Sequence, residues 1–368
     1  MDAPLLFLSA GDPSGDIASA RLLQRLLASR PGLTTFGLGG ARLAALGQRQ
    51  LAEPADLAVL GFWEVARRYR FFRHLMNRSV AEIEHMSPAC ILLVDYPGFN
   101  LRLAARVKRL GIPIVYYISP QVWAWAGRRI HRIKELVDRM LLILPFEKEL
   151  YDSHGIPNEL VGHYLVEDIP AQYIASDPPA AGQIALLPGS RRQEIERMLV
   201  PMLGAARRHL DAFGGKAVVA GVKNVYDYEK AMAPFAGEPI EIVYDDSRRV
   251  LYESDLVVTA SGTATLEAGI IGRPMVIIYK TGFVTYQIAR RLVTLRLIGL
   301  VNLVLGETVV PELIQYDASP DRIASELARY RTDAPYFQRV CERLKTVAGI
   351  LGGRGASERA AAAVGSYL

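Results

Sequence analysis

Short apolar runs alternate along the chain with stretches in which apolar residues recur at helical spacing. Within each run successive residues are apolar, which is typical of parallel strands covered by helices on both faces. The pattern therefore predicts an α/β protein with two Rossmann-like, doubly wound domains. We expect strands at 5–9, 91–94, 113–118 and 140–144 in the first half, and at 184–187, 217–220, 240–244, 256–259 and 275–279 in the second.

A stretch rich in proline and small residues, Glu167–Gln183, separates the two sets of runs and predicts a linker. We expect an N-terminal domain over 1–170, a C-terminal domain over 180–344, and a helix at about 345–368 that can pack back on the first domain. Two such domains, facing each other across a cleft, would bind ligands at the carboxyl ends of their strands.

Composition narrows the class of protein. The chain has 368 residues and a hydrophobic fraction of 51%, which suit two domains with sizeable cores. Its two cysteines, Cys90 and Cys341, predict neither a disulfide framework nor a metal site. No signal peptide and no apolar run of membrane-spanning length is recognisable, so we expect a cytoplasmic protein. The formal charge of +5 permits an anionic partner.

Two loops of the second half resemble anion sites at helix starts. Gly189, Ser190 and Arg191 follow one predicted strand, and Ser261-Gly262-Thr263 follow another. The first turn of a helix has unpaired N–H groups and roughly half a positive charge, and it therefore suits phosphate. One turn later, Glu267 could accept hydrogen bonds from ribose hydroxyls. The plainer alternative is an ordinary strand-to-helix turn capped by Ser261.

Acidic candidates follow strands of the first half. A carboxylate at Asp12 or Asp95 could accept a proton from an attacking hydroxyl, although either side chain could simply cap its own turn. No D-x-D spacing occurs in the sequence, so the usual carboxylate pair for a metal-bound diphosphate is absent. We therefore expect no metal, and we expect Arg191 and a helix start to stabilise the leaving-group charge.

A set of motifs in fixed order resembles the lipid-A-disaccharide synthase family, glycosyltransferases of the two-Rossmann GT-B type. The motifs are AGDPSGD, VDYPGFN, SPQVWAW, LPFEKELY, VGHYLVED, LLPGSRRQEIE, SDLVVTASGTATLE and GLVNLVLGETVVPELIQ. The resemblance implies an enzyme that joins UDP-2,3-diacylglucosamine to 2,3-diacylglucosamine 1-phosphate, giving a β-1,6 disaccharide phosphate and UDP. It implies no cofactor and no nucleic acid, a place on the inner face of the Gram-negative inner membrane, and it allows a homodimer.

The resemblance also assigns roles to individual residues. Asp95 stands at the family's essential aspartate, the favoured general base, with Asp12 and Asp16 as alternatives. Arg191 stands at an essential arginine, and Asn302 stands at an asparagine near the donor. The proposed donor site further includes Gly189, Ser190, Ser261, Gly262, Thr263, Glu267, Tyr279 and Lys280. Three positions depart from the family pattern: Asp12 replaces a glutamate, Val301 replaces a proline, and Gly282 lies where serine or Lys-Pro is usual.

The segment Gly61–Arg78 combines aromatic residues at helical spacing with interleaved arginines. Such a helix can lie in an anionic membrane interface, or it can be an ordinary helix packed on the first sheet. The segment 283–300 is a second candidate. The residues expected to face membrane or acyl chains are Phe62, Trp63, Val65, Tyr69, Phe72 and Met76. The alternatives to the synthase are a UDP-GlcNAc epimerase-like or lipid II-type enzyme, and a non-catalytic membrane protein that binds nucleotide.

Overall fold

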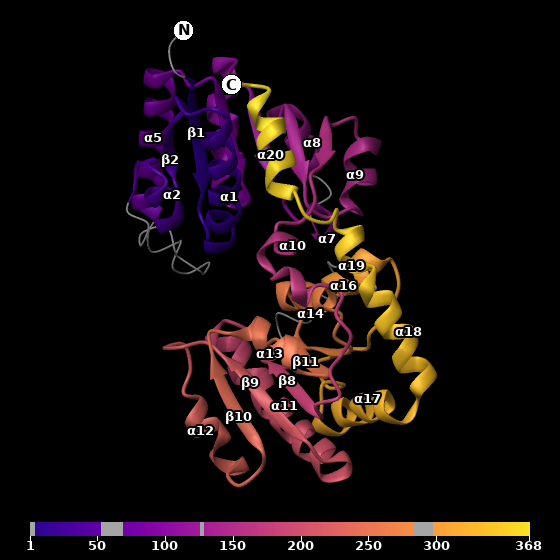
Figure 1. The fold of residues 1–368 in the computed structure, drawn as a ribbon. Helices are drawn as coiled ribbons and strands as arrows, with labels where there is room; N and C mark the ends of the chain where they lie inside the picture. Colours follow the sequence, from indigo (N-terminus) through magenta and orange to yellow (C-terminus); the bar gives the residue numbers. More distant parts are fainter. Residues whose placement is uncertain (1–3, 53–68, 126–128, 283–296) are drawn as a thin grey trace. The chain divides into compact units, whose positions relative to one another are not determined.

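The computed structural model describes residues 4–52, 69–125, 129–282 and 297–368. The chain forms two compact units (Figure 1), and each is described by itself. The first unit comprises Met1–Tyr164 and Arg354–Leu368, and the second comprises Leu165–Gly353.

The first unit contains a seven-stranded sheet in the order β3-β2-β1-β4-β5-β6-β7, and every pairing is parallel. Its strands are β1 (Leu5–Ala10), β2 (Thr34–Leu38), β3 (Arg49–Gln50), β4 (Cys90–Val94), β5 (Ile114–Tyr117), β6 (Arg139–Leu142) and β7 (Asn158–Leu160). Its helices are α1 (Pro13–Ser29), α2 (Ala41–Ala45), α5 (Tyr69–Met86), α6 (Pro97–Val107), α7 (Val122–Trp125), α8 (Arg129–Leu136), α9 (Glu147–Ser153) and α20 (Ala356–Gly365).

The second unit repeats this plan with six parallel strands in the order β10-β9-β8-β11-β12-β13. Its strands are β8 (Gln183–Leu187), β9 (Lys216–Gly221), β10 (Ile240–Tyr244), β11 (Leu256–Ala260), β12 (Met275–Tyr279) and β13 (Glu312–Ile314). Its helices are α10 (Leu165–Asp168), α11 (Arg192–Phe213), α12 (Tyr228–Met232), α13 (Ser247–Glu253), α14 (Thr263–Ile271), α16 (Leu300–Leu305), α17 (Pro320–Thr332), α18 (Ala334–Lys345) and α19 (Val347–Ile350).

All nine predicted strands are confirmed to within about two residues of their ends, and the doubly wound α/β class is confirmed with them. The sequence analysis missed β2, β3, β7 and β13. In β2 a glycine interrupts the apolar pattern: Gly37 has φ of 146°, and a Cβ there would lie 2.0 Å from the carbonyl oxygen of Leu8 on β1. Close approach of the two backbones therefore requires glycine at a position that weakens the strand pattern.

The C-terminal helix α20 belongs to the first unit, where it packs against α1. Arg30 at the end of α1 donates to the carbonyl oxygen of Gly365 (2.6 Å), and Arg25 pairs with Glu358 (3.4 Å). Arg359 also donates to the carbonyl oxygen of Val161 at 2.8 Å. The last residues of the chain therefore complete the packing of its first helix.

The predicted linker packs closely on the second unit. The ring of Tyr173 stacks on that of Tyr252, with centroids 3.9 Å apart. Ser176 accepts hydrogen bonds from Arg273 through both its carbonyl oxygen (2.8 Å) and its hydroxyl (2.9 Å). Arg273 is fully buried, and burial lowers its pKa to about 10. These contacts fix the segment locally, because the buried guanidinium needs the Ser176 oxygens as acceptors.

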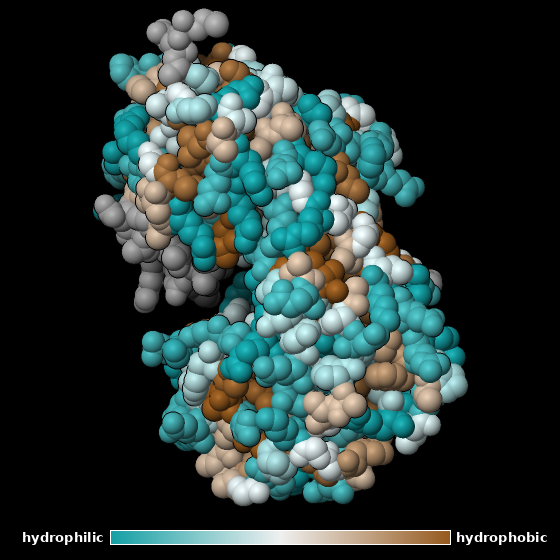
Figure 2. All heavy atoms as spheres, viewed as in Figure 1, coloured by the Kyte–Doolittle hydropathy of each residue, from teal (hydrophilic) through white to brown (hydrophobic). Residues whose placement is uncertain are grey.

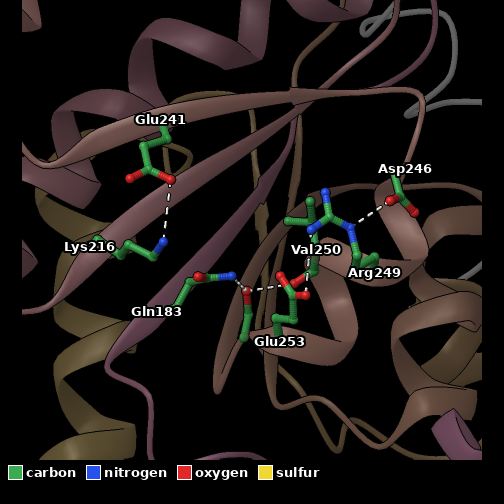
Figure 3. Close-up of polar contacts among 8 residues, drawn as sticks. Gln183, Lys216, Glu241, Asp246, Arg249, Val250 and Glu253 are labelled. Carbon is green, nitrogen blue, oxygen red and sulfur yellow. Dashed lines mark hydrogen bonds and ion pairs between the residues drawn. The ribbon is translucent and has the colours of Figure 1, made fainter.

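Polar contacts hold α13 in the second unit (Figure 3). Gln183 donates to the hydroxyl of Ser254 at 3.0 Å, and that hydroxyl donates to the carbonyl oxygen of Val250 at 2.7 Å. The bond from the first residue of β8 to the residue after α13 fixes this helix against the sheet. The other contacts drawn are Arg249 with Asp246 (2.6 Å) and Glu253 (3.6 Å), and Lys216 with Glu241 (3.3 Å).

Hydrophilic residues predominate on the face shown in Figure 2, and hydrophobic residues there form small patches. Within the described ranges, no helix has both the length and the apolar character needed to cross a membrane.

Candidate active site

The candidate loops lie at the switch points of the two sheets. In the first sheet β1 and β4 are neighbours, and the chain leaves them toward opposite edges; Asp12 follows β1 and Asp95 follows β4. In the second sheet β8 and β11 have the same relation, with Arg191 after β8 and Gly262 after β11. Doubly wound sheets bind ligands at this position, just beyond the carboxyl ends of the strands. The topology therefore brings the predicted residues of each unit together at one end of its sheet.

Asp95 and Tyr96 have an unusual backbone conformation. Both are left-handed, with φ of 44° and 47°. This conformation costs a residue other than glycine about 1–2 kcal/mol, least for Asp and Asn. Three bonds hold it in place: the Asp95 N–H donates to the Tyr117 carbonyl (2.9 Å), while its own carbonyl accepts from Tyr116 Oη (2.5 Å) and Asn100 Nδ2 (2.9 Å). Strain that neighbouring residues maintain in this way is typical of functional sites.

Asn100 is a clamp that the sequence analysis did not identify. Its amide is fully buried, accepts from the Ser9 hydroxyl (2.7 Å) and donates to the carbonyl oxygens of Val94 (3.1 Å) and Ser9 (3.3 Å). It therefore ties the end of β1 to the end of β4, where the two aspartates emerge. Its position in VDYPGFN was the only available signal.

The carboxyl groups of Asp12 and Asp95 are adjacent. Burial, together with the charge of Asp12, raises the pKa of Asp95 to about 7, against the effect of a hydrogen bond from the Tyr96 backbone. When protonated, Asp95 can share its proton with Asp12. Asp12 also caps α1, because its Oδ1 accepts from the Gly15 N–H at 2.6 Å. A carboxylate whose pKa lies near neutrality is well matched to general-base catalysis.

The Asp16 carboxylate binds backbone N–H groups at the start of α2. Its side chain is buried and accepts from the backbone N–H groups of Gly40 (2.8 Å), Arg42 (3.2 Å) and Leu43 (3.3 Å). It thus satisfies N–H groups in the first turn of α2. Asp16 as an alternative base stays a prediction, and its three hydrogen bonds to the backbone argue against it.

A third acid, Glu147, lies near Asp95, and the sequence analysis missed it. It is 1% exposed, and its Oε1 accepts from the indole Nε1 of Trp123 at 3.1 Å. Burial raises the pKa of Glu147 to about 8, and the charge of Asp95 contributes in the same direction. At neutral pH this side chain is mainly protonated and can therefore donate a hydrogen bond. The LPFEKELY motif was quoted without a role for its glutamate.

The start of α11 holds the predicted arginine. Arg191 is its N-cap residue, with a side chain 66% exposed, and pairs with Glu194 at 2.9 Å. Glu194 also accepts, at longer distances, from the N–H groups of Ser190 (3.3 Å) and Arg191 (3.4 Å). At Gly189, where φ is 109°, a Cβ would lie 2.6 Å from Glu194 Oε2. A carboxylate therefore already lies against this turn, and the guanidinium reaches solvent.

The start of α14 has no side-chain cap. Gly262 is the N-cap residue, with φ of 151°, and the Ser261 hydroxyl donates instead to the carbonyl oxygen of Ile298 at 2.9 Å. The alternative of a turn capped by Ser261 is therefore wrong. Thr263, the first residue of the helix, is exposed. One turn on, Glu267 accepts from Arg248 Nε at 2.9 Å, a contact that holds its carboxylate beside this helix start.

Asn302 lies in the interior of the second unit. Its Nδ2 donates to the Val310 carbonyl (2.9 Å) and Glu312 Oε1 (2.8 Å), and its Oδ1 accepts from the N–H groups of Val309 (3.0 Å) and Val310 (3.1 Å). The amide is thus fully occupied and orders a loop without reaching solvent. Its place near the donor stays a prediction. Tyr279, 37% exposed, and Lys280 end β12 at the same edge of the sheet as Gly262.

The aromatic–basic segment is only partly described. Phe62, Trp63 and Val65 lie outside the described residues, as does most of 283–300, and for Tyr69 only its place at the start of α5 is given. Met76 is 6% exposed and belongs to the core, with Phe72 packed against that core. Met76 therefore cannot insert into a membrane, because it already covers the sheet.

Phe72 and Met76 also line a pocket of about 570 Å³ confined to the first unit. It begins at Tyr96, the neighbour of Asp95. Among the described residues, no cluster of three His, Cys, Asp or Glu side chains could hold a metal ion.

Comparison with known proteins gives one consistent family. A family model described as lipid-A-disaccharide synthetase matches residues 6–349. A relative from Myxococcus xanthus named lipid-A-disaccharide synthase is 39% identical over 373 residues, covering 98% of this chain and 97% of its own length. A relative of the same name from Anaeromyxobacter dehalogenans is 41% identical over 366 residues, covering 97% and 95%.

Solved structures agree at the level of the fold. The calicheamicin glycosyltransferase has a TM-score of 0.61 at 15% identity, with 100% of this chain and 99% of that chain covered. A UDP-GlcNAc 2-epimerase from Neisseria meningitidis, bound to UDP-GlcNAc, has a TM-score of 0.59 at 11% identity, with 96% and 97% covered. At these identities the likeness shows the GT-B fold and nothing of the substrates.

Proposed function

Because the chain belongs to the lipid-A-disaccharide synthase family and is therefore a glycosyltransferase, we propose that it joins UDP-2,3-diacylglucosamine to 2,3-diacylglucosamine 1-phosphate with inversion at the anomeric carbon. The observation that carries this proposal is the Asp95 site. Asp95 has a left-handed backbone and lies at the switch point of the first sheet, and the pKa of its carboxyl group is near 7. Such a carboxylate is suited to remove a proton from an attacking hydroxyl.

The proposed reaction proceeds in one displacement. Asp95 accepts the proton of the acceptor 6-hydroxyl as that oxygen forms a bond to the anomeric carbon of the donor. The bond from that carbon to the diphosphate breaks, and UDP leaves with its electron pair. Arg191 and the uncapped start of α14 stabilise the charge that develops on UDP. Glu267, held by Arg248, accepts hydrogen bonds from the ribose hydroxyls.

The test is product analysis with the purified full chain, the two acylated substrates and the variant Asp95→Asn. Asparagine keeps the shape of the side chain and tolerates left-handed backbone, so the fold should be retained. We expect wild type to form the disaccharide phosphate and the variant to lose about 10²–10⁴-fold in kcat, with UDP affinity unchanged. Near-normal turnover by Asp95→Asn would remove Asp95 from the role of base.

A peripheral place on an anionic inner-membrane surface is a further part of the proposal. It is supported by the family's acylated substrates and by the aromatic and basic composition of 61–78. Flotation with anionic vesicles tests it: the variant Phe62→Ser with Val65→Ser should lose most of the binding that resists high salt, because inserted apolar side chains are not screened. Undiminished salt-resistant binding by the folded variant would exclude this segment as the anchor.

A further inference from the structure

The pocket beside Tyr96 combines two kinds of side chain. It is lined from α5, from the loop after β4, from α6 and from α8. Phe72, Met76, Tyr96 and Phe99 supply apolar surface, and the rings of Tyr96 and Phe99 stack with centroids 6.0 Å apart. The remaining lining residues are Gly98 and Ala105 and four arginines, Arg73, Arg102, Arg106 and Arg132. None of the described lining residues is acidic, so the pocket has a strongly positive wall beside a hydrophobic one.

Within the described ranges, carboxylates do not compensate the four arginines. All four are exposed, and none forms an ion pair with a carboxylate there. Arg106 Nη1 donates to Asn77 Oδ1 at 2.7 Å. Arg102 and Arg106 are four residues apart on α6, a spacing at which like charges repel. Just outside the pocket, Arg109 does pair with Glu84. Four arginines that line one pocket, with no carboxylate partner among the described residues, are suited to a phosphate, because a guanidinium can bind a phosphate through two parallel hydrogen bonds.

We propose that this pocket binds the phosphate and one acyl chain of the acceptor, 2,3-diacylglucosamine 1-phosphate, and this inference rests on the proposed function. The arginines take the phosphate, and Phe72, Met76 and Phe99 take the chain. The geometry of the sugar is compatible with this arrangement. Its 6-hydroxymethyl group is carried on C5 and its 1-phosphate on C1, and both carbons bond to the ring oxygen. A hydroxyl at Asp95 therefore keeps the phosphate within the length of one sugar ring, and the pocket begins at Tyr96, the neighbour of Asp95.

Gly11 and Tyr96 link the pocket to the catalytic loop. A Cβ on Gly11 would lie 2.2 Å from Tyr96 Cδ1, so the ring lies directly on the backbone that carries Asp12. The Tyr96 ring therefore contacts the backbone next to Asp12, and the same side chain lines the pocket. A ligand seated against Tyr96 would therefore be positioned relative to Asp95 by a fixed element.

The phosphate part of the proposal is tested by direct binding. The full chain in neutral detergent is titrated with short-chain diacylglucosamine 1-phosphate and with the same compound lacking the phosphate. Arg102→Gln and Arg132→Gln should each weaken binding of the phosphorylated ligand roughly five- to tenfold and change binding of the other ligand less than about twofold. Arg109→Gln removes an equal charge outside the pocket and should change neither. Equal losses for both ligands, or an equal loss in Arg109→Gln, would overturn the proposal.

The acyl part is tested by filling the pocket. Gly98 lies in α6 and lines the pocket, and a Cβ there would have no other atom within 4 Å, so Gly98→Leu adds bulk at the pocket wall from a position with open space. This variant should weaken binding of both acylated ligands at least about tenfold, with the melting temperature and UDP affinity unchanged. Gly349→Leu is the matched control, since Gly349 is an exposed helical glycine of the second unit that also has open space. Unaltered ligand binding by Gly98→Leu would overturn the acyl assignment.

An anionic phospholipid has similar chemistry, and vesicles of phosphatidylglycerol distinguish it from the acceptor. If these vesicles displace the acceptor, and Arg102→Gln loses vesicle binding, the pocket is a lipid-headgroup site and the proposal fails. These experiments also distinguish a failure of the pocket proposal from a failure of the proposed function. A wild type that binds phosphorylated acceptor through the arginines but forms no disaccharide would refute the proposed function alone. Normal turnover with the acceptor KM unchanged in Arg102→Gln would refute the pocket alone.

Discussion

Replacing Asp12 by asparagine should shift the pH dependence of transfer toward acid. The pKa of Asp95 rises from 3.8 to about 7, and burial is a larger cause than the charge of Asp12. Asp12→Asn removes that charge and leaves the burial, so we expect the pKa of Asp95 to fall by about one unit, equivalent to about 1.4 kcal/mol. Asparagine keeps the oxygen that caps α1, so helix α1 should be retained.

The assay is kcat/KM for the acceptor between pH 5 and 9, which reports ionisations of the free enzyme. In wild type, kcat/KM should fall on the acid side of the pH profile with a midpoint near pH 7. In Asp12→Asn this midpoint should lie near pH 6. At pH 5.5 the variant should keep roughly tenfold more of its own plateau activity than wild type does. Its plateau above pH 8 should be a few-fold lower, because a weaker base transfers a proton more slowly.

A control variant and two contrary results complete this test. Asp152 is exposed, pairs with Lys148 and is not among the causes of the Asp95 shift, so Asp152→Asn should leave the acid-side midpoint in place. If the acid-side midpoint of kcat/KM is the same in Asp12→Asn as in wild type, the two carboxyl groups do not interact. Loss of activity at every pH, with the fold intact, would instead make Asp12 the base.

Three other outcomes are expected. Glu147→Gln should raise the melting temperature at pH 8 but not at pH 4.5. The pKa of Glu147 is raised from 4.5 to about 8, so between these pH values the carboxyl group ionises in the unfolded chain and stays protonated in the folded one, and the free energy of unfolding falls as the pH rises. An equal effect at both pH values would contradict this reasoning. Arg191→Ala should weaken UDP binding roughly tenfold in titration calorimetry, and Arg192→Ala, whose partner is Glu196, should not. Turnover should persist in excess EDTA, since the sequence has no D-x-D pair; activity lost in EDTA and restored by Mg²⁺ would disprove the assigned role of Arg191.

The strands that were predicted and those that were missed differ in burial. Central strands such as β4 and β11 are buried on both faces, so each is a continuous apolar run. The missed β3, β7 and β13 have two or three residues each, and their side chains are mostly half-buried or exposed. Such short strands exist because a neighbour already offers hydrogen bonds, and this tertiary cause leaves no local pattern.

The places of the candidate residues in the fold were predictable where they depend on chain order and not where they depend on packing. Asp95 directly follows a predicted strand, and Asp12 and Arg191 lie in the turns after theirs; parallel sheets bring such positions to one edge. The hydrogen bonds of Asp16 to α2 and the full burial of Asn302 come from segments distant in sequence or from loop closure. Glu147 appears in the sequence as an ordinary helix-start acid, and only its burial beside Trp123 reveals a perturbed group.

The return of α20 to the first unit has a consequence for biosynthesis. The Arg30–Gly365 hydrogen bond joins residues 335 positions apart, so a nascent chain cannot complete its first unit until α20 has been synthesised. Synthesis of the whole second unit intervenes, on the order of 10–40 s at roughly 5–20 residues per second. During that time the surface of α1 that α20 will cover is open to chaperones or to aggregation. Premature termination just before α20 would therefore damage the unit made first and spare the one made last.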